Sequence, residues 1–198
     1  MDELAHALTV LERGEVVAFP TESFYGLGVD AMSEAAVARL VAVRGRGASK
    51  PILVLVRDLA MAAATVAGAV PAGARRLADR FWPGPLTLVL PATVGLPGPL
   101  TAGTGTIGVR APGHPTAAAL VDALGRPITA PSANPPGAEP PRRLADVRAY
   151  FADRVACYLD GGDLPGGAST VAAVEESAVR VLRAGPISEA ALTAAMGS

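Results

Sequence analysis

The amino-acid sequence predicts an α/β fold with a mixed β-sheet and flanking helices. Helical and strand patterns alternate early in the chain, whereas strand patterns cluster near its end, which favours a mixed sheet over a strictly parallel one. Hydrophobic residues make up 51% of the chain and charged residues 18%, as is typical of a globular protein. No linker separates two parts of different composition, so we expect a single domain over residues 1–198.

The helices are predicted from periodic apolar residues and from the residues that end them. The opening helix covers residues 3–12 and stops at Gly14. Ser33 is a typical N-cap for a helix that runs to about Val43, with its apolar residues on one face. Further helices are expected over residues 58–67, 71–81, 115–124, 143–152 and 188–196.

The strands are predicted from short apolar runs between turn residues. Residues 15–19 form the first strand, which Pro20 ends. Residues 52–56 are continuously apolar, which indicates a strand covered on both faces. Further strands are expected over residues 86–90, 106–110, 127–130, 155–159, 169–174 and 179–183.

Charge and composition exclude several classes of protein. The net charge of −1 argues against a nucleic-acid binder that is basic overall, but not against a local basic cleft. The single cysteine excludes an internal disulfide framework, and two histidines do not support a Cys/His zinc site, so no protein metal site is expected. The start of the chain is acidic and is no secretory signal. The uncharged apolar stretch 59–70 is shorter than the roughly 20 residues of a membrane span. We therefore expect a cytoplasmic protein without membrane contact.

Two loop segments follow the first strand and the second helix. Residues 20–28 combine hydroxyls, a carboxylate and glycines, which suits either a ligand-binding turn or an ordinary one. Residues 44–50 bring together Arg44, Arg46 and Lys50. Arginine forks and a lysine charge beside glycines are typical of phosphate recognition, although such a cluster is also compatible with a solvated loop at a helix C-terminus.

A third segment, residues 101–114, contains the pattern G-x-G-x-x-G. We reject a dinucleotide site, because the glycines run into a predicted strand and Pro112 forbids a helix directly after it. Arg110 at the end of that strand is a better candidate for binding an anion. His114 precedes Pro115 at a predicted helix start, so we expect it to cap the helix or lie on the surface.

The fourth segment is a proline-rich loop, residues 129–137, that carries Ser132 and Asn134. A serine hydrolase is disfavoured, because the chain has two histidines and no G-x-S-x-G pattern. The P-loop pattern is also absent from the sequence, so any ATP site is of another type.

The order of these segments carries more information than any one of them. The chain resembles the YrdC/Sua5 family over roughly residues 10–187, through PTESFYGLG, RGRGASKPILVLV, WPGPLTLVL, GTIGVRAPGHP, APSANPPG, LDGGDLPGGAST and VLRAG. The resemblance implies a YrdC-like domain of the short form, with a large basic cleft on a twisted mixed sheet. It also implies synthesis of threonylcarbamoyl-AMP and pyrophosphate from L-threonine, bicarbonate and ATP, for the t6A37 modification of tRNA.

The resemblance also implies roles for individual residues. Arg44 and Arg46 would be catalytic and bind the ATP phosphates. The full set implied for ATP is Arg44, Arg46, Lys50, Thr106, Ser132, Asn134 and Arg183. The set implied for threonine is Ser23, Arg110, Ala130 and Ser169, with Arg110 holding the carboxylate. Mg2+ is expected to arrive with ATP, and a downstream tRNA threonylcarbamoyltransferase complex is the expected partner.

The sequence departs from the family pattern at several of these segments. Arg44 stands where lysine is usual, Ser23 where threonine is usual, and Leu55 where histidine is common. Pro136 and Pro140 replace serines in the nucleotide loop. These departures leave open a carbamoyl-adenylate enzyme with another acceptor. A non-catalytic RNA-binding module is a further alternative, which the net charge and the 4% aromatic content disfavour.

Overall fold

Two hydrogen-bonded sheets and the helices around them make up the computed structural model, which describes residues 3–45, 50–176 and 178–197. The helices are α1 (Glu3–Glu12), α2 (Glu34–Arg44), α3 (Leu59–Thr65), α4 (Ala72–Phe81), α5 (Gly98–Thr101), α6 (Pro115–Leu124), α7 (Leu144–Phe151) and α8 (Glu189–Met196). The strands are β1 (Val17–Phe19), β2 (Gly26–Gly28), β3 (Val54–Leu55), β4 (Leu86–Pro91), β5 (Thr106–Arg110), β6 (Ile128–Thr129), β7 (Cys157–Tyr158), β8 (Thr170–Val174) and β9 (Val179–Arg183). Every helix and strand expected from the sequence is present.

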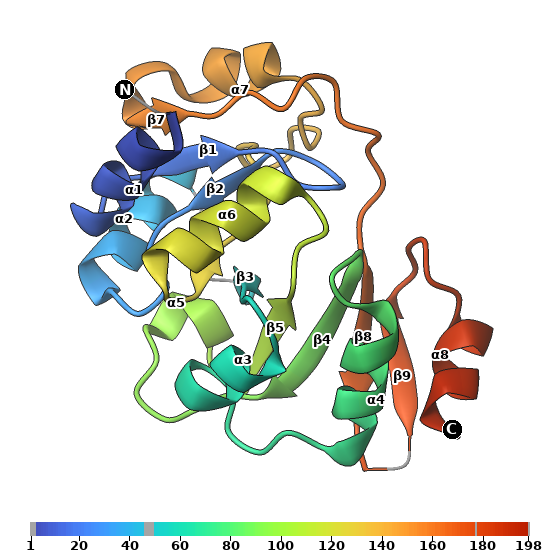
Figure 1. Ribbon diagram of the computed structural model, residues 1–198. Coiled ribbons are helices and arrows are strands. Elements are labelled where there is room, and N and C mark those ends of the chain that lie inside the picture. The colour runs from blue at the N-terminus through green and yellow to red at the C-terminus, as the bar shows by residue number, and fades with distance from the viewer. Residues whose placement is uncertain (1–2, 46–49, 177, 198) are drawn as a thin grey trace.

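The strands are divided between two mixed sheets. The three-stranded sheet, with the order β2-β1-β7, lies in the upper half of Figure 1 with α1, α6 and α7. The six-stranded sheet has the order β6-β3-β5-β4-β8-β9 and contains both parallel and antiparallel neighbours. Isolated bridges from Gly26 to Ser132 and from Asp30 to Ile128 connect the region of β2 to that of β6. The α/β class and the mixed pairing are confirmed, with two sheets in place of the one expected.

Strand β2 lies where the sequence predicts a turn. It pairs with β1, with Val17 opposite Gly28. A Cβ atom at Gly28 would lie 2.7 Å from Phe19 Cε1 and 2.8 Å from Ile128 Cγ2, so the close packing of the two sheets requires glycine here. A three-residue strand with two glycines shows no alternation of polar and apolar side chains, which is why its pattern does not reveal it.

Side-chain caps begin the two helices for which the sequence predicts them. Ser33 Oγ accepts a hydrogen bond from Ala36 N at 3.3 Å at the start of α2. His114 Nδ1 accepts one from Thr116 N at 3.2 Å at the start of α6, which confirms its predicted capping role. None of the described helices is both long and apolar enough to cross a membrane.

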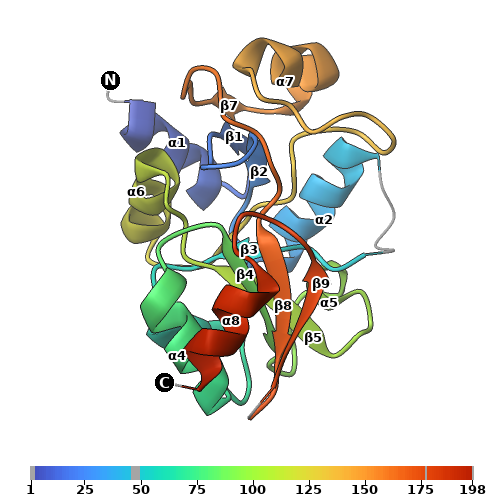
Figure 2. The same ribbon diagram turned by 90° about the vertical axis from the view of Figure 1, so that its right-hand side faces the viewer.

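The six-stranded sheet has two faces of different character, set by the alternation along β4. Leu86, Leu88 and Leu90 are fully buried on one face, and each such leucine stabilises the fold by about 1.5–3 kcal/mol. Helices α4 and α8 pack side by side on that side of the sheet (Figure 2). Thr87 and Val89 point to the opposite face, which is left for the site.

Candidate anion-binding site

The face of the six-stranded sheet opposite α4 and α8 forms the floor of a cavity of about 650 Å³. Alternate residues of its strands point into the cavity, as the period of a strand requires. They are Thr87 and Val89 of β4, Thr106, Gly108 and Arg110 of β5, and Val171 of β8. The walls come from the loop after β1, the residues around the α2–β3 connection, the loop after β6 and the residues before β8.

A β-bulge places two consecutive residues of β9 on this same face. Leu182 and Arg183 both line the cavity, although neighbouring residues of a regular strand point to opposite sides. The register explains it: Val171 pairs with Arg183, but Ala172 pairs with Val181, so Leu182 is an extra residue. The bulge therefore turns an apolar side chain and a guanidinium to the same side.

Most of the predicted site residues meet in this cavity. Those that line it are Ser23, Arg44, Lys50, Thr106, Arg110, Ala130, Ser132, Ser169 and Arg183. Arg46 lies outside the described residues. Asn134 is not part of the lining: its Nδ2 donates to Ala138 O at 2.7 Å and to Pro135 O at 3.1 Å, which fixes the turn behind Ser132. A contact of Asn134 with ATP therefore stays a prediction.

Four cations of the described residues face the cavity in two groups, which we call the arginine pair (Arg110 and Arg183) and the α2–β3 cations (Arg44 and Lys50). Arg110 is 3% exposed, and its Nη1 lies 3.2 Å from Glu22 Oε1. Burial lowers the pKa of Arg110; Glu22 opposes this and Arg183 adds to it. Arginine nevertheless stays protonated in proteins, so this end of the cavity holds a fixed positive charge.

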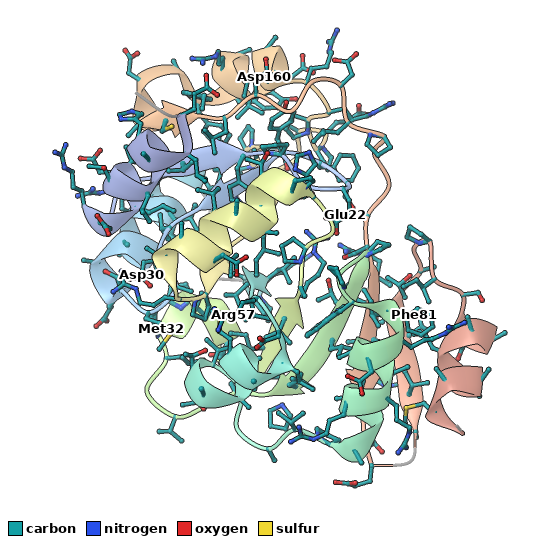
Figure 3. The ribbon with its side chains drawn as sticks, in the orientation of Figure 1. Glu22, Asp30, Met32, Arg57, Phe81 and Asp160 are labelled. Atoms are coloured by element: carbon teal, nitrogen blue, oxygen red, sulfur yellow. The ribbon has the colours of Figure 1, made fainter. Side chains whose placement is uncertain are left out.

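Glu22 contacts both Arg110 and the loop after β5. Its Oε2 accepts a hydrogen bond from Gly113 N at 3.2 Å, just before α6 (Figure 3). Burial lowers the pKa of the nearby His114, with Glu22 acting in the opposite direction. The Glu22 carboxylate therefore forms an ion pair with Arg110 and accepts a hydrogen bond from the loop after β5, a role that no sequence motif indicated.

Arg183 is oriented by Ser169 and, through it, by Thr87. Its Nη2 donates to Ser169 O at 2.9 Å and to Ser169 Oγ at 3.1 Å. Ser169 Oγ lies 2.9 Å from Thr87 Oγ1. Burial lowers the pKa of Arg183. Sequence analysis missed Thr87, although a polar residue among the leucines of a buried strand is itself a signal.

The loop after β1 is both an ordinary turn and a wall of the cavity. Thr21 Oγ1 donates to Phe24 O at 2.7 Å and accepts from Ser23 N at 3.2 Å. Ser23 O accepts from Gly166 N at 3.0 Å, which ties this turn to the late glycine-rich loop. The turn is therefore part of the cavity wall, and ligand binding by residues 20–28 stays a prediction.

Tyr25 joins three of the loops around the cavity. Its backbone N donates to Pro141 O, and its backbone O accepts from Ala133 N. Its hydroxyl accepts from Gly161 N at 2.9 Å and lies 3.2 Å from an oxygen of Asp160 (Figure 3). Burial raises the pKa of Tyr25, and Asp160 adds to the rise. The hydroxyl therefore stays protonated and structural.

The lining supplies hydroxyl and cationic groups for binding anions. Within the described ranges, no group of three or more His, Cys, Asp or Glu side chains is arranged to hold a metal ion. Leu55, which replaces a histidine common in the family, is fully buried and does not line the cavity. The arrangement thus suits a ligand with carboxylate or phosphate groups.

The fold and the cavity together define an α/β protein with a cation-lined cavity on one face of its six-stranded sheet. A family model for Sua5, YciO and YrdC, described as "Telomere recombination", matches residues 9–185. The chain belongs to this Sua5/YciO/YrdC family, as the sequence predicts.

Known relatives carry a more specific name. The chain is 40% identical over 176 residues to the threonylcarbamoyl-AMP synthase of Pyrococcus abyssi, covering 88% of this chain and 52% of the relative. It is 38% identical over 197 residues to the synthase of Bacillus subtilis, covering 98% and 57%. The crystal structure of P. abyssi Sua5 complexed with L-threonine superposes with a TM-score of 0.92 at 37% identity, over all of this chain and 58% of that one. The chain thus spans little more than half the length of these relatives.

Proposed function

We propose that this chain is a threonylcarbamoyl-AMP synthase, a nucleotidyltransferase that joins L-threonine, bicarbonate and ATP. The observation that carries the proposal is the meeting of the predicted threonine and ATP residues in one cavity, around the arginine pair and the α2–β3 cations. The names of the relatives and the threonine complex of P. abyssi Sua5 support the choice of amino acid.

The first step in this proposal is the formation of a carbamate. Arg110, fixed by Glu22, binds the carboxylate of threonine and leaves its amine free. The amine nitrogen attacks the carbon of bicarbonate, a C–N bond forms, and water leaves, so that threonine becomes an N-carboxylate. Ser23 and Ala130 line the space for the amino acid.

In the second step, an oxygen of the carbamate attacks the α-phosphorus of ATP. A new P–O bond forms, the bond to the bridging oxygen between the α- and β-phosphorus breaks, and pyrophosphate leaves. Such a transfer depends on positioning and charge stabilisation more than on a protein nucleophile. Arg44 and Lys50 supply positive charge to the cavity, and we place the β- and γ-phosphates against them, with Arg183 at the α-phosphate and the carbamate that attacks it.

Arg44 differs from the family pattern, which usually has lysine at this position, and its side chain lines the cavity. It is the last residue of α2, it is buried, and it lines the cavity. A planar guanidinium contacts two phosphate oxygens at once, where lysine offers a single charge. We therefore propose that Arg44 takes over the usual role of lysine at the phosphates.

Mg2+ is proposed to enter with ATP. The described lining offers hydroxyls and cations, and Glu22, the carboxylate beside it, is already engaged with Arg110 and Gly113. Mg2+ prefers carboxylates, water and substrate phosphates, so this donor set does not fit a metal held by the protein.

The product would be consumed elsewhere. We propose a cytoplasmic role in t6A37 modification, with a tRNA threonylcarbamoyltransferase complex as the downstream partner. The net charge of −1 gives no support to broad binding of RNA, so any RNA contact would be local.

Mass spectrometry of a complete reaction tests the proposal. The purified protein is incubated with ATP, Mg2+, bicarbonate and L-threonine, and each component is omitted in turn. We expect an adduct of threonine, carbonate and AMP that requires all of them. An adduct that forms with another amine, but not with threonine, would replace this function by a carbamoyl-adenylate enzyme with a different acceptor.

A further inference from the structure

Thr87 occupies a special place on the cavity floor. It belongs to WPGPLTLVL, a family segment to which no site residue was assigned. Thr87 is 3% exposed. It directly precedes Leu88, whose register partner is Val109, so Thr87 lies beside Arg110 on the same face of the sheet. Its hydroxyl also contacts Ser169, which binds Arg183. Thr87 is therefore positioned between the two members of the arginine pair.

A count of hydrogens shows what Thr87 and Ser169 offer. Ser169 Oγ accepts from Arg183 Nη2 at 3.1 Å, which uses one of its lone pairs. The two hydroxyls carry two hydrogens, and only one of them lies in the contact of 2.9 Å between Ser169 and Thr87. Across the ranges that the structure describes, no protein acceptor takes the other hydrogen. When Thr87 donates, Ser169 Oγ accepts from both Thr87 and Arg183, and the O–H of Ser169 is left to donate into the cavity.

The surrounding charge selects an anion as the acceptor of this hydrogen. Arg110 and Arg183 carry two positive charges, which Glu22 balances only in part. A single carboxylate or carbamate group would complete the balance, and hydroxyl donors to such groups form strong hydrogen bonds. A compact ligand group fits because Gly108, the neighbour of Val89 across the strands, has no side chain.

We propose that Thr87 is a positioning residue of the amino-acid subsite. Through Ser169 it directs one hydroxyl hydrogen at a carboxylate-class oxygen of the substrate, held between Arg110 and Arg183. This oxygen belongs to the carboxylate of threonine or to the carbamate formed on its amine. The inference rests on the proposed function. It adds Thr87 to the site, with a role that Ser169 and Arg183 cannot fulfil without it.

The test uses Thr87→Val, which removes the hydroxyl and keeps a similar shape, and Thr87→Ser, which restores the hydroxyl. Thr93→Val is the matched control, because Thr93 donates to Ala67 O away from the cavity. Initial rates give KM separately for threonine, bicarbonate and ATP, and thermal unfolding monitors the fold. We expect Thr87→Val to raise KM for threonine or bicarbonate about fivefold to tenfold, as for one hydrogen bond to a charged group. KM for ATP should stay within about twofold, and Thr87→Ser should recover most of the loss.

Calorimetry without bicarbonate separates the two sources of the oxygen. If it is the carboxylate, Thr87→Val weakens threonine binding as much as it raises KM for threonine. If it is the carbamate, threonine alone binds normally and KM for bicarbonate rises.

A double-mutant cycle with Ser169→Ala decides whether Thr87 acts through Ser169. We expect Thr87→Val to add little once Ser169 is alanine, because the hydroxyl that it orients is gone. Full additivity, unchanged KM values, or a failure of serine to rescue would overturn the proposal. If the wild type binds threonine but forms no adduct, the proposed function fails, and calorimetry still measures the effect of Thr87. A wild type that binds no threonine overturns both.

Discussion

The arginine pair and the α2–β3 cations face one cavity but are held in different ways. Arg110 is buried against Glu22, and Arg183 binds both the carbonyl and the hydroxyl of Ser169. Lys50, by contrast, is exposed, whereas Arg44 is buried at the end of α2. Charged groups that are fixed before binding need no reorganisation and select a ligand by its geometry. A flexible lysine supplies positive charge with little preference for direction. This difference suits a planar carboxylate at the first group and phosphates at the second.

The largest effect is expected for Arg110→Ala, which removes half of the arginine pair. The threonine KM should rise about 30-fold to 100-fold, as for the loss of a buried charged partner. Stability should also fall by about 3 kcal/mol, because Glu22 is left without its partner.

The double variant Arg110→Ala with Glu22→Gln separates these two effects. It should recover much of the stability but none of the threonine affinity. Steady-state rates and denaturant unfolding provide the measurements. A threonine KM that does not change in Arg110→Ala would remove Arg110 from the carboxylate.

Arg46→Ala tests the predicted binding of the ATP phosphates by the segment between α2 and β3. Its role rests on the family resemblance, since Arg46 lies outside the described residues. Turnover should fall at least about tenfold, which corresponds to about 1.4 kcal/mol of transition-state stabilisation, while the fold is retained. Arg57→Ala is the control, because Arg57 is exposed and pairs with Asp58 away from the lining (Figure 3). Near-normal activity of Arg46→Ala would confine phosphate binding to Arg44, Lys50 and Arg183.

Sequence patterns predicted the elements better than the contacts between them. Helices α1 and α6 have the predicted bounds, because their caps and apolar periods are local signals. The bulge at Leu182 and the contact between Thr87 and Ser169 depend on how distant strands register, which no local pattern encodes. Most of the site residues came from the resemblance in segment order, and the structure shows how the sheet brings them together. Glu22 and Tyr25 were missed because their roles are contacts with residues distant in the sequence, which no motif encodes.

Two glycines sharpen the comparison through the backbone. A Cβ at Gly185 would lie 2.6 Å from Ala168 O, directly beside the residue that orients Arg183. Gly185→Ala should therefore destabilise the protein by about 1–3 kcal/mol and raise the threonine KM as well. Gly45, after α2, has a φ of 64°, and among the described residues beyond its chain neighbours no atom lies within 4 Å of its Cβ position, so Gly45→Ala should cost only about 1 kcal/mol and leave that KM unchanged. If both variants changed the threonine KM equally, the proposed difference in how firmly the two groups of cations are held would be wrong.

The smallest effect is a pH dependence of stability at His114, which lies near Glu22. Nδ1 must be neutral to accept from Thr116 N, and burial lowers the pKa of His114 in the folded state. The unfolded chain therefore binds the proton more readily, so the contribution is present above pH 6.5, the ordinary value, and is lost as the pH falls through the lower folded pKa. His114→Asn keeps a capping oxygen that does not titrate. Between pH 8 and pH 5, the unfolding free energy of the wild type should fall by up to about 1 kcal/mol more than that of the variant. Parallel pH profiles would show that the cap makes no such contribution.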